Sequence, residues 1–495
     1  MVALPEPSTS ARNDPRGPAP RDAHITTTRG WQQVTAAYLG AALLVALVVE
    51  PAVLRRVAIH DYHNFDLGIY SQALYRLSLS DLNPWLTVRE TKIFNDHFDP
   101  ILLLVAPAAK IFEPATVAVI AELLFVLASP LPFVWLFRAG RLSASVTALG
   151  IVVLLWNRGV GNALQFPAHP TTWAILPMSA LAAAIALDRR WWVLLTCTAL
   201  FLFKEEFPFV GLMVAAIYLA RREYRFALLI GAWSLFWIVG VFYFRPWIVG
   251  PVHQHAADRF VNLGQPLEGV KLALEGLVSR PVLHAALPLV PLMVWIAWGR
   301  HRASTPLLLL IVPLVAIRLL GRAWGAHYLA PLMPVLIVGL LPIGSSIKVP
   351  RWVMLSTLVL LVSISFGPWK RSVELLAWPT MGPPRPPAPE RLASIESGRQ
   401  YLLAHQEGKA LVQGNLIPLL VRRAELYQVA GSHNPAEHTF RYTFIEKPPF
   451  GDPWPVEYED YRQLLAQWRS APRTRVIRDD AHVWLAEGVF HDRPR

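Results

Sequence analysis

The sequence predicts an all-α polytopic membrane protein with about eleven transmembrane helices and a small C-terminal α/β domain outside the membrane. Of its 495 residues, 54% are hydrophobic and only 16% are charged, whereas soluble domains contain about 25% charged residues. Apolar runs of span length recur throughout residues 31–366. Arginines gather in the short turns between these runs, as the positive-inside rule predicts for cytoplasmic turns.

Charge and cysteine content exclude several classes of function. The net charge of +12 comes largely from these arginine-rich turns, so we expect no nucleic-acid partner. Cys197 is the single cysteine and lies in an apolar run, which excludes a disulfide framework, a thiolate metal cluster and a redox pair. Residues 1–30 lack the apolar core of a signal peptide, and we expect a disordered cytoplasmic tail there.

The expected transmembrane domain covers residues 31–369 and begins with a span at 31–49, followed by a large external loop at 50–99. An apolar stripe in this loop predicts a helix at 65–77. The next apolar stretch, 100–112, is only about 20 Å long as a helix. If it crossed the membrane, most later arginine clusters would fall outside. We therefore predict a helix at the outer membrane surface.

The later apolar runs supply the other expected spans, and together they place every basic turn in the cytoplasm. These spans are 115–137, 144–156, 173–187, 191–203, 207–220, 226–244, 283–298, 306–320, 328–341 and 352–366.

A Pro-rich linker at 370–389 leads to the expected extracytoplasmic domain, 390–495. Its pattern alternates between helix-like and strand-like stretches, which indicates a small α/β unit. It contains no glycine-rich nucleotide motif, so we assign it no cofactor. The helix-like stretches are 391–405, 417–423 and 456–469, and the strand-like stretches are 410–413, 426–429, 475–477 and 482–486.

Polar residues from separate loops and span ends fall on the external side in this topology. They are Asp61, His63 and Asp66; Asp96, His97 and Asp99; Asn162, Gln165 and His169; Lys204, Glu205 and Glu206; and Arg322, His327 and Tyr328. The Lys204-Glu205-Glu206 group has almost no loop around it. Ionisable residues at such depth are costly and face a cavity or a partner.

Each group also has a structural alternative. Asp66 suits the first turn of a helix, where the helix dipole favours a carboxylate. Lys204 and Glu205 can neutralise each other at a span end, and His169 can be an ordinary loop residue between prolines. The spacing of the first-loop histidines and aspartates matches no standard zinc pattern, so metal ligands stay unassigned.

Three motifs carry a family resemblance: Phe65-Asp66-Leu67-Gly68-Ile69-Tyr70-Ser71-Gln72, His97-Phe98-Asp99-Pro100 and Lys204-Glu205-Glu206. They resemble a bacterial membrane-protein family of unknown function with an FDLG-xxx-Q motif, which looks like a branch of the GT-C membrane glycosyltransferases. The resemblance covers most of the chain. It implies a GT-C-like enzyme of the bacterial cytoplasmic (inner) membrane that transfers a sugar from a polyprenyl-phosphate-linked donor. The acceptor, at the outer face of the bilayer, would be a glycan, a lipid or a protein.

By this resemblance Asp66 matches the catalytic acidic residue. Lys204 is the first candidate for stabilising the leaving phosphate, with Arg322 and His327 as alternatives. GT-C first loops often contain adjacent acidic pairs, whereas Asp66 follows Phe65, and this departure argues against dependence on a divalent metal. The expected substrate-binding residues are Asp61, His97, Asp99, His169, Lys204, Glu205, Arg322 and His327.

Two other functions fit parts of the pattern. A transporter or flippase for a lipid-linked or polar solute would use Lys204 and Glu205 as a coupling site, but no internal repeat of the transporter kind is evident. A non-catalytic receptor or assembly factor would leave Asp66, His97 and Lys204 far apart and facing solvent. The positions of these side chains therefore distinguish the hypotheses.

Overall fold

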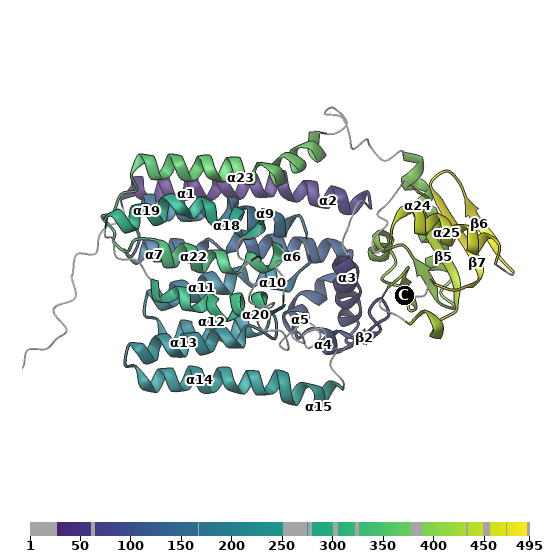
Figure 1. Ribbon diagram of the computed structural model, residues 1–495, viewed down its shortest axis with the longest axis horizontal. Coiled ribbons are helices and arrows are strands. Elements are labelled where there is room, and N and C mark those ends of the chain that lie inside the picture. The colour runs from purple at the N-terminus through teal and green to yellow at the C-terminus, as the bar shows by residue number, and fades with distance from the viewer. Residues whose placement is uncertain are drawn as a thin grey trace, which may run out of the picture.

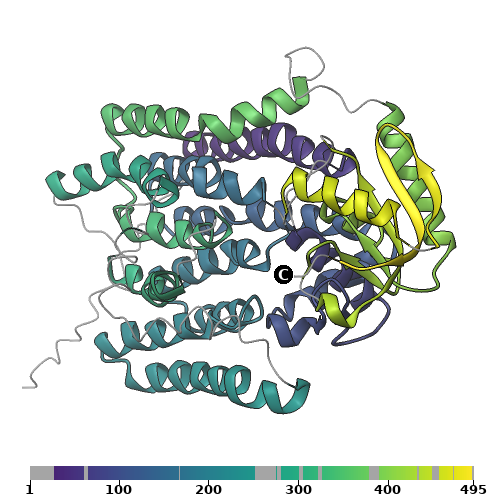
Figure 2. The same cartoon turned by 45° about the vertical axis from the view of Figure 1, so that its right-hand side comes forward.

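A bundle of nearly parallel helices makes up most of the molecule, and a domain with a β-sheet covers one end of it (Figures 1 and 2). The computed structural model describes residues 27–60, 65–166, 168–250, 275, 280–299, 305–321, 326–377, 389–431, 434–448, 456–471 and 473–492.

The chain enters the bundle through one long helical segment. It consists of α1 (Thr28–Leu44), the π-helical turn Val45–Val49 and α2 (Glu50–Ala58). The Thr27 side chain caps α1 by accepting a hydrogen bond from the amide of Gly30. The helix continues beyond the expected end of the first span at residue 49, through the π turn to Ala58.

The expected loop helix is present as α3 (Phe65–Ser78). A short hairpin, β1 (Trp85–Leu86) and β2 (Thr91–Lys92), follows it and leads into α4 (Ile93–Asp96). The stretch 100–112 forms α5 (Ile101–Val105) and the 3-10 helix Ala106–Lys110, which pack against α3 at the end of the bundle nearest the C-terminal domain (Figure 1).

The remaining helical elements follow the expected apolar runs, but prolines and short 3-10 or π segments break several of them. They are α6 (Pro114–Ala128), α7 (Leu131–Arg138), α8 (Ala144–Trp156), α9 (Arg158–Leu164), α10 (Pro170–Trp173), α11 (Ile175–Ala186), α12 (Arg190–Phe201), α13 (Pro208–Ala220), α14 (Tyr224–Val239), the π-helix Gly240–Phe244, α15 (Arg245–Val249), α18 (Arg280–Ala286), the 3-10 helix Leu287–Leu289, α19 (Val290–Gly299), the 3-10 helix Thr305–Ile311, α20 (Val312–Gly321), α21 (Ala326–Leu329), α22 (Leu332–Leu340) and α23 (Arg351–Ala377).

Helix length alone accounts for fewer spans than the sequence predicts. Among the described residues, four helices are long and apolar enough to cross a membrane, or up to five if the bent pair α8 and α9 counts as one span. Other apolar helices have 10–17 residues, which is at or below the length that a bilayer core requires. The structure therefore supports several membrane-spanning helices without confirming a count of eleven.

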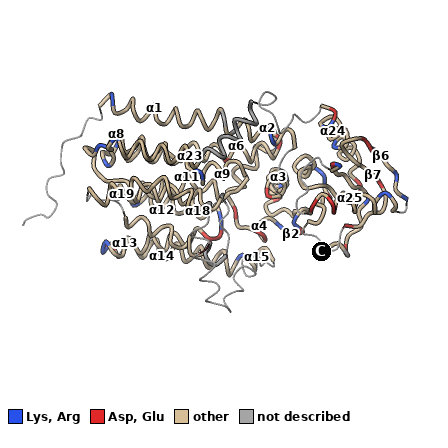
Figure 3. The backbone as a smooth tube through the Cα atoms, turned by 45° about the horizontal axis from the view of Figure 1, so that its top comes forward, with Lys and Arg blue, Asp and Glu red and all other residues tan. Residues whose placement is uncertain are grey.

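Basic residues mark the end of the bundle that lies away from the C-terminal domain. Figure 3 shows them at the start of α1, the start of α8 and the end of α13. Because these turns share one end, the segment formed by α5 and the following 3-10 helix does not reverse the direction of the later helices. This arrangement agrees with the interfacial placement expected for residues 100–112.

The C-terminal domain contains one mixed five-stranded sheet with strand order β4-β3-β5-β7-β6. Strand β3 is parallel to β4 and β5, and the other pairs are antiparallel. The elements are α24 (Pro389–Ala404), β3 (Ala410–Val412), the 3-10 helix Gly414–Leu419, β4 (Leu426–Gln428), the 3-10 helix Pro435–Glu437, β5 (Phe440–Glu446), α25 (Tyr458–Arg469), β6 (Arg475–Asp479) and β7 (Val483–Phe490).

Two expectations for this domain are wrong. The central strand β5 has no counterpart in the sequence analysis. Its sequence alternates, with Phe440, Tyr442 and Phe444 separated by Arg441 and Thr443, so the pattern of a strand was present and was overlooked. The stretch 417–423 was expected to be helical, but the helical turns lie at Gly414–Leu419 and are of the 3-10 type, with Pro418 inside. The linker expected at 370–389 starts later, because α23 continues to Ala377.

The FDLG-xxx-Q motif joins the bundle to the C-terminal domain. A side chain at Gly68 would come within 2.8 Å of Ile417, so the motif glycine allows α3 to approach the 3-10 helix of the other domain. Gln72 is fully buried and donates to Thr87 at 2.9 Å, and Thr87 in turn donates to the carbonyl of Leu426 at 2.6 Å. The glycine and the glutamine of the motif are therefore explained by packing.

Candidate functional site

Residues that are distant in sequence meet around the first turns of α3, at the end of the bundle nearest the C-terminal domain. They come from α3, the segment after α4, the loop before α10, the turn between α12 and α13, and α21. We call this group the Asp66 cluster. Its members are Asp66, Tyr70, His97, Asp99, His169, Lys204, Glu205 and His327.

Asp66 is held by a buried histidine. His169 Nε2 lies 2.9 Å from Asp66 Oδ2, and His169 Nδ1 lies 3.0 Å from the carbonyl oxygen of Phe166. Both ring nitrogens face oxygen acceptors, so the ring can donate a hydrogen bond to Asp66 or to the carbonyl of Phe166. The amide of His169 donates to Glu122 Oε2 at 3.0 Å, which fixes the backbone that carries the ring.

The Asp66 carboxylate remains accessible. Its side chain is 37% exposed, whereas that of His169 is 7% exposed. Among the described residues, only His169 is hydrogen-bonded to the Asp66 carboxylate, and it uses a single oxygen. Burial raises the pKa of Asp66, but the hydrogen bond and charge of His169 outweigh it, so that the pKa lies below its usual value. Asp66 therefore presents an ionised oxygen that can accept a proton.

An aromatic stack connects Asp66 to Lys204. The ring of His169 stacks on His327 with centroids 4.0 Å apart, and Phe166 stacks on His169 at 4.9 Å. The ring of Tyr328 lies 3.9 Å from that of His327. The ammonium of Lys204 lies 5.1 Å from the Tyr328 ring, within the range of a cation–π contact. This stack holds a lysine ammonium on the same face of the bundle as Asp66.

His97 and Glu205 form a second pair beside the first. His97 Nδ1 lies 3.4 Å from Glu205 Oε1, and the amide of Phe98 donates to Glu205 Oε2 at 3.0 Å. Burial and the Lys204 ammonium lower the pKa of His97. The carboxylates of Asp96 and Glu205 outweigh them and raise that pKa to about 9. At neutral pH, His97 is therefore a cation paired with Glu205.

Asp99 is the most deeply buried carboxyl of the cluster. It is fully buried and accepts a hydrogen bond from the Tyr70 hydroxyl at 3.1 Å. Its other oxygen, Oδ1, has no hydrogen-bond partner among the described residues. Burial is the largest cause that raises the pKa of Asp99, to about 7. This carboxyl can hold or release a proton near neutral pH.

The structure brings most of the expected residues together. Asp66, His97, Lys204 and Glu205 lie in one group with the other described members of the Asp66 cluster, which does not fit the separated, solvent-facing arrangement that a non-catalytic surface would show. Asp61 and Arg322, which were also expected to contribute, lie outside the described residues.

Sequence analysis missed three residues at or beside the cluster. Tyr70 lies one helical turn after Asp66, so the helix period alone would have placed it on the same face. Glu122 and Arg245 are nearly fully buried charged residues inside long apolar segments. Charged residues in such a position are functional candidates by default, and this signal is visible in the sequence. Arg245 donates to the carbonyl of Asn95 at 3.3 Å.

Metal ligands remain unassigned. Within the part of the chain that the structure describes, no group of three or more His, Cys, Asp or Glu side chains could hold a metal ion. The histidines of the Asp66 cluster instead face carboxylates and other rings. The chemical roles below are therefore given to the side chains of this protein.

Comparison with known families places the chain. The model of the family described as predicted membrane protein (DUF2079) matches residues 61–467, which is most of the sequence. The chain belongs to the DUF2079 family. No curated protein matches it. The match begins just before Asp66 and includes every described member of the Asp66 cluster, together with most of the C-terminal domain.

Two solved structures are similar to this DUF2079 protein. The crystal structure of ArnT from Cupriavidus metallidurans, bound to undecaprenyl phosphate, is similar with a TM-score of 0.55 and 14% identity, covering 93% of this chain and 98% of ArnT. A cryo-EM structure of the arabinofuranosyltransferase AftD from Mycobacteria is similar with a TM-score of 0.46 and 13% identity, covering 93% of this chain and 40% of AftD. The likeness to ArnT shows that the two chains share a fold.

Proposed function

We propose that this protein is a membrane glycosyltransferase that transfers a sugar from a polyprenyl-phosphate-linked donor to a hydroxyl acceptor. The observation that carries the proposal is the accessible, ionised Asp66 carboxylate, which is paired with the buried His169 at 2.9 Å and has a pKa lowered by the charges of His97 and Arg89 as well. The fold shared with ArnT, whose structure contains undecaprenyl phosphate, supports the class of donor.

Asp66 is the proposed general base. An acceptor hydroxyl is a poor nucleophile and needs a base within hydrogen-bond reach. Its oxygen bonds to the anomeric carbon of the donor while its proton passes to Asp66. The bond between the anomeric carbon and the phosphate oxygen breaks, and the electron pair leaves with the polyprenyl phosphate. His169 keeps the carboxylate oriented and ionised during this step.

Lys204 is the proposed stabiliser of the leaving phosphate. Negative charge develops on the phosphate as the glycosidic bond breaks, and a fixed cation at that place lowers the barrier. Lys204 is 7% exposed and contacts the Tyr328 ring, so its ammonium is held in a site from which most water is excluded. The buried Arg245 adds a second positive charge near the carboxylates of Glu205 and Asp99.

The proposed orientation follows from the basic end of the bundle. The positive-inside rule places the basic turns at the ends of α1, α8 and α13 in the cytoplasm (Figure 3). The Asp66 cluster and the domain at 390–495 then lie at the outer face of the bacterial cytoplasmic membrane, and the N-terminal tail lies inside. A lipid-linked donor would reach the site from the outer leaflet.

The test is the exchange of Asp66 for asparagine, which keeps the shape of the side chain and removes the base. Membranes with wild-type or variant protein receive radiolabelled polyprenyl-phosphate sugars, and the release of label from the lipid is measured. Asp66→Asn should reduce release by about 10²- to 10⁴-fold. Asp81→Asn, the same change at an exposed position of the same loop, should release label at the wild-type rate. Wild-type activity in Asp66→Asn would overturn the assignment.

A further inference from the structure

A cavity of about 270 Å³ lies where the bundle meets the C-terminal domain. Its walls come from the end of α2, the starts of α3 and α6, helix α24 and the 3-10 helix Gly414–Leu419, which meet in this region in Figure 2. Small-molecule sites usually have volumes of about 300–1,000 Å³, so this cavity is suited to a ligand of about one sugar unit. One wall contains Leu67, the residue that follows Asp66.

We propose that this cavity binds the acceptor of the transfer reaction through a neutral, hydroxyl-rich group, namely a saccharide unit. The inference rests on the proposed glycosyltransferase function and adds the chemical class of the acceptor. Its first support is the position of the cavity beside the helix that carries Asp66. Its other supports are the hydrogen-bonding groups and the charges of the walls.

A buried acceptor atom in the wall lacks a donor. Asn415 is 4% exposed and donates through its side-chain nitrogen to the carbonyl of His60 at 3.0 Å. Its side-chain oxygen has no hydrogen-bond partner among the described residues. An unpaired buried acceptor is costly. A rotation of the Asn415 side chain that turns this oxygen toward the cavity would let a ligand hydroxyl donate to it and remove the cost. Asn415 also belongs to the stretch that resembles the family's C-terminal part.

His60 supplies a second acceptor. Its backbone has a φ of 57°, a strained left-handed conformation for a residue with a side chain. Burial and the charge of Arg391 lower the pKa of His60 to about 4, so its ring is neutral at physiological pH. A neutral imidazole ring has one donor nitrogen and one acceptor nitrogen. The cavity therefore favours a ligand with several hydrogen-bond donors.

The charged side chains of the wall are already neutralised. Arg399 donates to both carboxylate oxygens of Glu396, at 2.7 and 3.0 Å. Glu113 lies 3.5 Å from Arg422. No wall charge is therefore left without a counter-charge among the described residues, and the cavity favours neither a phosphate nor an ammonium group. Ala58, Leu67 and Leu419 provide apolar surface for the carbon face of a sugar ring.

The test uses the full-length protein in detergent micelles and saturation-transfer NMR. The probes are methyl α-D-mannopyranoside, methyl β-D-glucopyranoside and methyl β-D-galactopyranoside, with glycerol 3-phosphate and choline as charged comparisons. At least one glycoside should receive saturation from the wild-type protein, and the charged probes should not. Asn415→Leu should weaken glycoside binding at least tenfold. Asn434→Leu, the same exchange at an exposed position outside the cavity wall, should leave binding unchanged.

A second variant guards against a folding defect. Leu419→Trp fills the cavity and leaves Asn415 in place, and thermal melting identifies which variants are folded. The proposal is overturned if no glycoside binds to the wild-type protein, if a charged probe binds in preference, or if the folded cavity variants bind as the wild type does.

The same variants separate this proposal from the catalytic one. Asp66→Asn should bind the glycosides normally, because Asp66 does not belong to the cavity wall. If Asp66→Asn transfers sugar normally, the catalytic assignment fails whatever the cavity binds. If Asp66→Asn is inactive but the wild-type protein binds no glycoside, only the acceptor site fails.

Discussion

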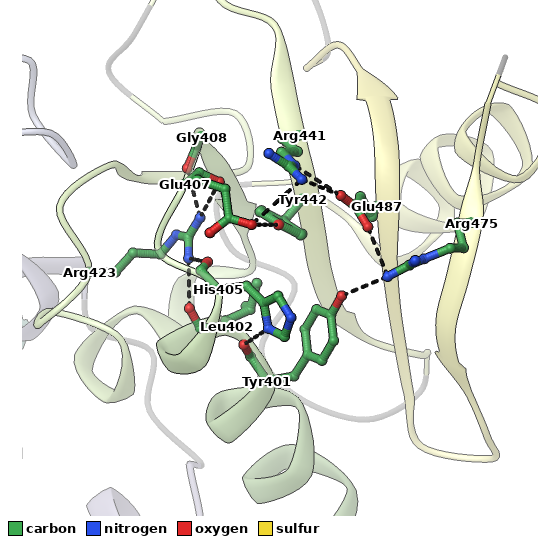
Figure 4. Close-up of polar contacts among 10 residues, drawn as sticks. All are labelled: Tyr401, Leu402, His405, Glu407, Gly408, Arg423, Arg441, Tyr442, Arg475 and Glu487. Carbon is green, nitrogen blue, oxygen red and sulfur yellow. Dashed lines mark hydrogen bonds and ion pairs between the residues drawn. The ribbon is translucent and has the colours of Figure 1, made fainter.

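Two polar clusters of this protein contain similar side chains, but they differ in which polar atoms remain available to bind a ligand. One is the Asp66 cluster. The other, here the Arg423 cluster, lies in the C-terminal domain and consists of Tyr401, His405, Glu407, Arg423, Arg441, Tyr442, Arg475 and Glu487 (Figure 4). Both clusters contain histidine, tyrosine and several charges, so the types of residue alone would not show which one carries the chemistry.

Most polar groups of the Arg423 cluster are paired within the same domain. Arg423 is fully buried and donates to backbone carbonyls in the last turn of α24 and just after it, including Leu402 at 2.6 Å and Gly408 at 2.7 Å. Its Nε has no hydrogen-bond partner among the described residues. At the surface, Glu487 accepts from Arg441 at 2.7 Å and lies 3.0 Å from Arg475. The guanidinium groups here bind carbonyls and carboxylates of the same domain, which stabilises the fold.

The Asp66 cluster contains carboxylate oxygens that its own contacts do not use. Asp66 has a carboxylate oxygen with no hydrogen bond to a described residue, and Asp99 has an unpaired buried oxygen with a raised pKa. Its parts come from elements that are distant in sequence, whereas the Arg423 cluster comes from one small domain. The accessible carboxylate oxygen of Asp66 therefore distinguishes the candidate site from the Arg423 cluster, whereas shifted pKa values do not, because the pKa values of Arg423 and Tyr442 are shifted as well.

After the loss expected for Asp66→Asn, the largest effect is expected at Lys204. Lys204→Met keeps most of the side-chain volume and removes the charge, so we expect sugar release to fall by about 10²- to 10³-fold, as for the loss of one electrostatic stabiliser. Donor consumption in membranes measures this effect. Lys110→Met, at an exposed lysine, is the matched control and should be fully active. Unchanged activity in Lys204→Met would move the phosphate role to another cation.

Arg423 should affect stability and not chemistry. Arg423→Met leaves several buried carbonyls without a donor, which should lower the free energy of unfolding of the C-terminal domain by about 3 kcal/mol. Limited proteolysis in denaturant measures it. Arg422→Met changes the neighbouring arginine, which is 43% exposed, and should cost less than about 1 kcal/mol. If folded Arg423→Met no longer releases sugar from the lipid-linked donor, the Arg423 cluster also contributes to the reaction, and the proposed difference between the two clusters is wrong.

The helices were predictable because long apolar runs are separated by short polar turns, several of which contain arginine. The starts of α3 and α8 and the end of α13 follow the expected bounds closely. The breaks at prolines, such as Pro130 between α6 and α7, were visible in the sequence. The π-helical turns were not predictable, since they depend on packing between helices. Strand β5 was predictable but was overlooked, because Phe440, Tyr442 and Phe444 alternate with Arg441 and Thr443.

The site was partly predictable for a different reason. Asp66, His97 and Lys204 stand in motifs, and buried charge is conspicuous in an apolar chain. Their pairing was not predictable. Glu205 bonds to His97 and Asp66 bonds to His169, across more than 100 positions of sequence in each case. Such contacts depend on the tertiary arrangement of the helices, which no local pattern encodes.

The pair of His97 and Glu205 should make stability depend on pH. The pKa of His97 is raised from 6.5 to about 9, so its contribution is complete below pH 6.5 and is lost as the pH rises through about 9. The pKa of Glu205 is lowered from 4.5, so its contribution is present above pH 4.5 and is lost only in stronger acid.

Glu205→Gln should therefore cost on the order of 1 kcal/mol at about pH 6, after allowance for the partial exposure of His97. This cost should shrink toward zero at about pH 10. Melting temperatures of both proteins in detergent across this range measure the difference. A cost that stays constant with pH would mean that Glu205 acts through its hydrogen bond to the Phe98 amide and not through His97.

The smallest expected effect is at Arg475, and it is the most direct test of the comparison. The side chain of Arg475 is 67% exposed, and it contacts Glu487 and the Tyr401 hydroxyl at about the same distance, 3.0 and 3.1 Å. Exposed ion pairs contribute about 0–1 kcal/mol, so Arg475→Ala should barely change the melting temperature and should leave sugar release intact. If Arg475→Ala instead lowers release while the protein melts normally, the edge strand β6 contacts a substrate. The Arg423 cluster would then hold binding capacity that its internal contacts hide.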